Sequence, residues 1–181
     1  WAGTNATIGT EYRRLPRDVL QCHYGRGDKA GESPFHPSED EDVVYQSKML
    51  SRAKVEGIGL SQTSASRFDD GYDARVRKRI TDNAGVPALT SAEAIGAAAQ
   101  ALGVKRVAIV TPYSTEVIQR AATYYKNNFG LEASGLEAFE ATAAFKISSL
   151  TADTATPALA RRASTASRAF LIPGGTFQAM S

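Results

Sequence analysis

Hydroxyl-bearing side chains gather in short segments that each come directly after an apolar run. These segments are Ser61 to Ser66 (Ser-Gln-Thr-Ser-Ala-Ser) and Thr111-Pro112-Tyr113, and a third, Pro173 to Thr176, contains two glycines. Hydroxyls donate hydrogen bonds without carrying charge, and glycine lets a ligand approach backbone N–H groups closely. Uncharged donors and helix N-termini suit a small carboxylate.

Strands must position these segments. Arg106–Val110 is apolar and mostly β-branched, which predicts a strand buried on both faces as in a parallel sheet. Val55–Leu60 and the short apolar run Ala169–Ile172 are also predicted to be strands. Ligands of open α/β sheets bind at the carboxyl ends of such strands. A plain connection with a packed tyrosine is the structural alternative for Thr111-Pro112-Tyr113.

Helices are predicted by apolar spacing and by their end signals. Ser114 or Thr115 begins a helix that runs to Phe129 and ends at Gly130. The other predicted elements are helices over Val43–Lys54, Asp69–Asn83, Ala92–Leu102 (with a Thr90/Glu93 capping box) and Pro157–Arg168 (with Thr156 as cap), a short strand over Val19–Tyr24 carrying a buried Cys22 thiol, and a surface loop over 25–42. Residues 131–147 fit no element.

Composition excludes several classes of function. The chain has 181 residues, 43% hydrophobic and 22% charged, with a net charge of +2 and no long run of one sign. This pattern does not favour binding to nucleic acid or to an anionic membrane, and no apolar run approaches the about 20 residues of a bilayer span. With a lone Cys22 and two histidines, we expect no disulfide, no metal site and no cofactor, and a cytoplasmic location.

Several segments, in this order, resemble the aspartate/glutamate racemase superfamily, specifically its arylmalonate decarboxylase and maleate cis-trans isomerase branch. The segments that carry the resemblance are Asn5–Glu11, Leu60–Ser66, Val86–Ala92, Leu102–Ala108, Thr111–Tyr113, Asp153–Thr156 and Leu171–Gly175. The resemblance covers most of the chain outside residues 25–42. The agreement of Thr-Pro-Tyr with the family is close.

The resemblance implies an α/β fold of two flavodoxin-like lobes with parallel sheets. The lobes would be related by a pseudo-two-fold axis, with the substrate in the cleft between them. We expect an N-terminal lobe over residues 1–89 and a C-terminal lobe over 90–181 that is truncated relative to the family. A homo-oligomer stays open, because small α/β enzymes often form symmetric dimers.

The resemblance also implies a carboxylate site. Thr63, Ser64 and Tyr113 fall where the decarboxylases bind a carboxylate, and they are the predicted catalytic residues. Asn5 falls where the isomerases hold a carboxylate, and backbone N–H groups near Ser64 and Gly174 would complete the pocket. The full predicted substrate-binding set is Asn5, Gln62, Thr63, Ser64, Tyr113, Pro173, Gly174 and Gly175.

The chain departs from the family at its two cysteine positions. Family members typically use one or two thiols, one in each lobe, but Gln62 and Pro173 stand at these positions here. Neither side chain can shuttle a proton near neutral pH. The prediction is therefore a carbon-acid enzyme acting on a small mono- or dicarboxylate, with cofactor-independent decarboxylation first. A cis-trans isomerase or racemase, a non-catalytic carboxylate binder, and a hydrolase using Ser61 or Ser66 are the alternatives.

Overall fold

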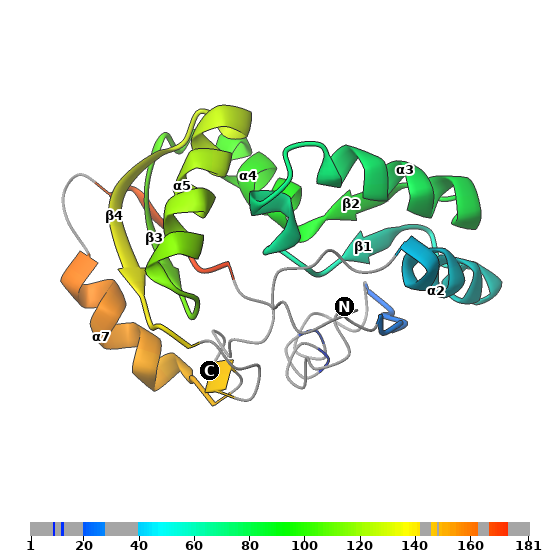
Figure 1. Cartoon of the computed structure of the whole chain (residues 1–181), viewed down its shortest axis with the longest axis horizontal. Coiled ribbons are helices and arrows are strands. Elements are labelled where there is room, and N and C mark those ends of the chain that lie inside the picture. Colours follow the sequence, from blue (N-terminus) through cyan, green and yellow to red (C-terminus); the bar gives the residue numbers. More distant parts are fainter. Residues whose placement is uncertain are drawn as a thin grey trace.

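The computed structural model describes residues 9, 12, 20–27, 40–141, 146–147, 149–162 and 167–173. Two sets of parallel strands, each flanked by helices, lie side by side (Figure 1). The elements in chain order are α2 (Asp40–Arg52), β1 (Ile58–Leu60), the 3₁₀ helix η1 (Ala65–Arg67), α3 (Tyr72–Ala84), β2 (Ala88–Thr90), α4 (Ser91–Ala101), β3 (Arg106–Thr111), α5 (Thr115–Phe129), β4 (Glu132–Ala138), α7 (Ala152–Arg162) and β5 (Ala169–Leu171).

The first sheet pairs β1 with β2 in parallel, from Ile58 opposite Ala88 to Leu60 opposite Thr90. Helices α2 and α3 pack against each other, and α3 also contacts β2. The apolar cluster between these elements consists of Val43, Ile58, Ala65, Tyr72, Val76 and Ile80. The cluster fixes where β1 ends, and with it the segment that follows.

The second sheet has the order β4-β3-β5, with every pairing parallel. Val107 and Ile109 of β3 join a buried cluster with residues of α4 and α5. Side chains alternate along a strand, so Ala108 and Val110 face the other side, and α7 also contacts β3 and β4. Because both faces of β3 are buried, its carboxyl end is held firmly.

The α/β class with parallel sheets is therefore confirmed, while the pseudo-two-fold relation stays a prediction. The helix over Thr115–Phe129 forms as expected and ends at Gly130, whose φ of 65° lies in the left-handed region that glycine tolerates. The capping box also forms: Thr90 Oγ1 accepts a hydrogen bond from the backbone N–H of Glu93 at 3.2 Å.

Some predicted elements are wrong. Residues 20–24 form no strand, and Cys22 is exposed instead of buried. Helix α7 begins at Ala152 and ends at Arg162, so Pro157 lies inside the helix instead of at its first position, and Asp153 favours the first turn.

Strand β4 lies in the stretch that fitted no element. Its sequence, Glu-Ala-Ser-Gly-Leu-Glu-Ala, has low β propensity, but the hydrogen bonds offered by β3 stabilise it.

Within the described residues, no helix is long and apolar enough to cross a membrane.

Candidate functional site

Residues 62–64, which follow β1, lie in the protein interior. Gln62, Thr63 and Ser64 are all buried, and Arg67 N donates to the Ser64 carbonyl at 3.2 Å as η1 closes. Thr63 Oγ1 is buried and has no hydrogen-bond partner among the described residues. A buried hydroxyl without a partner is uncommon and costs stability, so this oxygen keeps its capacity for a ligand.

The loop after β3 is held by the chain that follows β4. Tyr113 N donates to Thr111 Oγ1 at 3.0 Å, and the carbonyl of Tyr113 accepts from Glu140 N at 3.2 Å. The carbonyl of Pro112 accepts from Ala141 N at 2.8 Å. These bonds fix the backbone of the loop, and the Tyr113 residue is half-buried.

The two loops meet through Arg67. Its guanidinium carbon lies 5.4 Å from the centroid of the Tyr113 ring, and η1 contacts α5. The sequence places Arg67 only at the edge of a polar segment, and nothing in Ser-Arg-Phe-Asp distinguishes it from a surface arginine. Its burial, with 6% of the residue exposed, is visible only in the structure.

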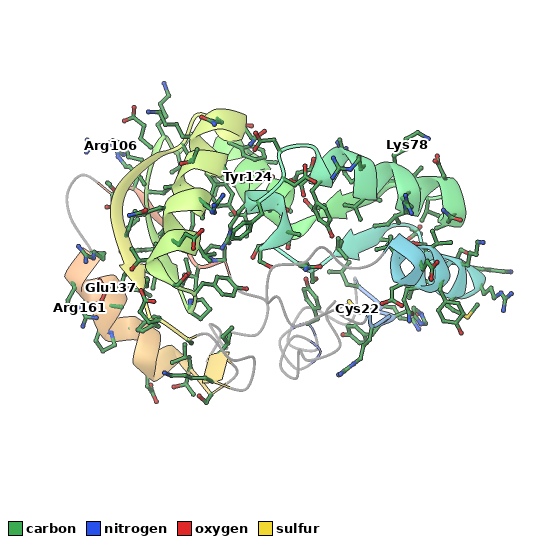
Figure 2. The ribbon with its side chains drawn as sticks, viewed as in Figure 1. Cys22, Lys78, Arg106, Tyr124, Glu137 and Arg161 are labelled. Carbon is green, nitrogen blue, oxygen red and sulfur yellow. The ribbon has the colours of Figure 1, made fainter. Side chains whose placement is uncertain are left out.

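A buried hydrogen-bond network supports the same region. Asp73 of α3 accepts from Ser66 Oγ at 2.8 Å and from the hydroxyl of Tyr124 at 2.6 Å. It therefore ties η1 to α5 across the boundary between the two sheets, where Figure 2 shows Tyr124. Sequence reasoning did not find this network, because Asp73 and Tyr124 are 51 positions apart.

The two neighbouring tyrosines of α5 stay protonated over a wide pH range. Burial, and secondly the hydrogen bond to Asp73, raises the pKa of Tyr124 well above its usual range. Burial also raises the pKa of Tyr125 to about 12, and the adjacent Arg67 guanidinium opposes the rise. Neither the Tyr125 hydroxyl nor the Arg67 guanidinium makes a hydrogen bond that meets the distance and angle criteria within the described part of the chain.

The remaining predicted residues are placed unequally. Pro173 follows β5 and is buried, and because β5 pairs with β3, Pro173 lies at the same sheet edge as Tyr113. Asn5, Gly174 and Gly175 lie outside the described residues. The structure thus links the segments after β1 and β3 through the contact of Arg67 with the Tyr113 ring.

A cavity away from these loops lies beside β1 and α2. It has a volume of about 570 Å³ and is lined by residues 20–25 together with parts of α2 and β1, but not by Gln62, Thr63, Ser64 or Tyr113. The exposed Cys22 lines it, and Figure 2 shows this side chain beside α2. Across the described ranges, no group of three or more His, Cys, Asp or Glu could hold a metal ion.

Comparison with known families assigns the chain. The model of the family described as arylmalonate decarboxylase matches residues 35–181. The chain belongs to the arylmalonate decarboxylase family. The search of curated proteins gives no match.

Solved structures share the fold of this family member. The maleate isomerase Iso from Pseudomonas putida, in its structure with maleate, is 22% identical with a TM-score of 0.83, covering 98% of this chain and 76% of that one. The maleate cis-trans isomerase of Nocardia farcinica is 17% identical, with a TM-score of 0.74 and coverage of 97% and 76%. An unliganded arylmalonate decarboxylase is 24% identical, with a TM-score of 0.66 and coverage of 80% and 66%. These TM-scores establish that the chain shares its fold with the two maleate isomerases and with the decarboxylase.

Proposed function

We propose that this chain is a cofactor-independent enzyme acting on a small mono- or dicarboxylate, and that its reaction is decarboxylation of the arylmalonate type. The substrate would lie between a lobe formed by residues 1–89 and a lobe formed by 90–181. Family membership supports carboxylate chemistry. The observation that carries the proposal is the meeting of two hydroxyl-bearing loops, where Arg67 packs over the Tyr113 ring.

The chemistry follows from uncharged donors. The bond to the departing carboxylate breaks, carbon dioxide leaves, and the electron pair passes to the remaining carboxylate as an enediolate. This step needs no base. Thr63, Ser64 and Tyr113 would donate hydrogen bonds to the enediolate oxygens, and each such donor can lower the barrier by about 3 kcal/mol. A proton from water or from the Tyr113 hydroxyl then completes the product.

The residues at the family's cysteine positions favour this reaction over the alternatives. In the superfamily, racemisation uses two thiols and cis-trans isomerisation uses one as a nucleophile, and Gln62 and Pro173 supply neither a nucleophile nor a proton. Decarboxylation uses a thiol only to protonate the enediolate, and water or Tyr113 can supply that proton. The same substitutions also favour a second candidate, a relative that binds a carboxylate without turning it over.

Product analysis separates these candidates. We would measure carbon dioxide release and cis-trans isomerisation over a panel of malonates and maleates. Tyr113→Phe should lower kcat by about 10²–10³-fold, because it removes one donor. Tyr45→Phe is the matched control, since Tyr45 is 59% exposed on α2.

Carbon dioxide release that depends on Tyr113 supports the decarboxylase. Isomerised product without carbon dioxide would instead support the isomerase alternative. Thermal stabilisation by these acids without any product supports the non-catalytic binder. Equal turnover by the wild type and Tyr113→Phe would contradict the proposed role of the phenol.

A further inference from the structure

Arg67 is a buried cation that the described residues leave without a hydrogen-bond partner. The residue is 6% exposed, and none of its nitrogens Nε, Nη1 and Nη2 makes a hydrogen bond. It also forms no ion pair with any described carboxylate. Removing a charge from water without a counter-charge is among the costliest arrangements in a protein interior.

The groups around Arg67 offset little of this cost. The Tyr113 ring at 5.4 Å provides a cation–π contact, which recovers only a fraction of the lost hydration. Asp73 is a buried carboxylate in the same region, but its two oxygens accept from Ser66 and Tyr124. Asp73 is therefore committed to hydroxyl donors, and Glu116, which lines the same cavity as Arg67, pairs with Arg120.

The position of Arg67 points to where the missing anion binds. Its own backbone N–H is used by the Ser64 carbonyl, so the side chain starts one turn beyond Thr63 and Ser64 and reaches the Tyr113 ring. A guanidinium offers five N–H groups in a planar fork that matches a carboxylate or a phosphonate. The nearby Thr63 Oγ1 is likewise buried and without a partner.

We propose that Arg67 supplies the positive charge of this carboxylate site and makes it select for negative charge on the bound group. The guanidinium pairs with the anion held by Thr63, Ser64 and Tyr113, and pairs more strongly as that anion gains charge. The inference rests on the proposed function for the location of the anion. It adds a residue role: an enediolate carries more negative charge on its oxygens than the carboxylate from which it forms, so Arg67 favours the later state.

Three ligands with the same benzyl group test the proposal without requiring turnover. Phenylacetamide, phenylacetate and benzylphosphonate share a benzyl group and carry no charge, one and two negative charges at a pH above the second pKa of the phosphonate. Calorimetry on the full chain should show affinity rising by about tenfold or more with each added charge in the wild type.

In Arg67→Met, the three ligands should bind with similar affinities. In Arg67→Lys, affinity should still rise with ligand charge but by smaller factors, because lysine keeps the positive charge and lacks the planar set of N–H donors. Arg120→Met is the matched control. Arg120 lies over the Phe68 ring, pairs with Glu116 and lines the same cavity of about 510 Å³ as Arg67. It should leave the series unchanged.

The possible outcomes distinguish the role of Arg67 from the proposed function. A charge series that survives in Arg67→Met, or that is lost in Arg120→Met, overturns the role of Arg67 and leaves the carboxylate site standing. Wild-type protein that binds none of the three ligands overturns the proposed function, and the role of Arg67 with it. Ligand-free Arg67→Met should melt at the wild-type temperature or above, so a variant that fails to fold shows a structural role and also overturns the proposal.

Discussion

The hydrogen bonds of Asp73 allow the coupling between the two sheets to be measured. Asp73 accepts at 2.8 Å from Ser66 Oγ and at 2.6 Å from the Tyr124 hydroxyl, and both donors are buried. A hydrogen bond to a charged acceptor contributes about 1.5–3 kcal/mol. Asp73→Asn keeps one acceptor oxygen and so loses one such bond, while its neutral amide costs less to bury.

The net loss for Asp73→Asn should therefore be about 1–2 kcal/mol of unfolding free energy. For a chain of this size, that corresponds to a fall in Tm of about 2–8 °C. Tyr124→Phe should cost about 1.5–3 kcal/mol, because it leaves one buried carboxylate oxygen without a donor. The double variant should cost less than the sum, since both changes weaken the bond from the Tyr124 hydroxyl to the charged Asp73 carboxylate.

Urea denaturation of the wild type, both single variants and the double variant gives the coupling energy. We expect at least about 1 kcal/mol between Asp73 and Tyr124, with Tyr45→Phe within about 0.5 kcal/mol of the wild type. Additive effects within about 0.5 kcal/mol would refute the reasoning, because they would mean that the bond between α3 and α5 contributes nothing specific.

Other changes test packing, capping and ionisation. Gly96→Ala would place a Cβ 2.4 Å from the Phe129 ring. The cost of overpacking, about 1–3 kcal/mol, should exceed the gain in helix propensity of about 1 kcal/mol. Tm should therefore fall, and a higher Tm would contradict this contact. Thr90→Ala should cost about 1 kcal/mol in denaturant titrations by removing the acceptor for Glu93 N, whereas Thr90→Ser should keep it. Burial raises the pKa of Tyr125 to about 12, so the unfolded chain releases this proton at a lower pH than the folded chain does. The unfolding free energy should therefore fall as pH rises from about 10 to 12. Tyr125→Phe should reduce that fall, and the same pH dependence in wild type and variant would count against a buried phenol.

Local chemistry was enough to predict much of the second sheet. The run Arg106–Val110, the helix over Thr115–Phe129 and its end at Gly130 each depend on neighbouring residues only, and all three form. The Thr90 capping box also depends on a spacing of three residues. The predicted hydroxyl segments do follow β1 and β3, and their role in binding a carboxylate stays a prediction.

Contacts between distant residues decided the rest. Strand β4 forms because β3 offers it a parallel partner, although its own residues do not favour a strand. Cys22 is exposed because residues 20–24 find no such partner in the described part of the chain. Burial of Arg67 and the bond from Tyr124 to Asp73 both arise where η1 meets α5. The sequence specifies which charged side chains the chain carries. Their burial and their neighbours depend on segments that come together only when the chain folds.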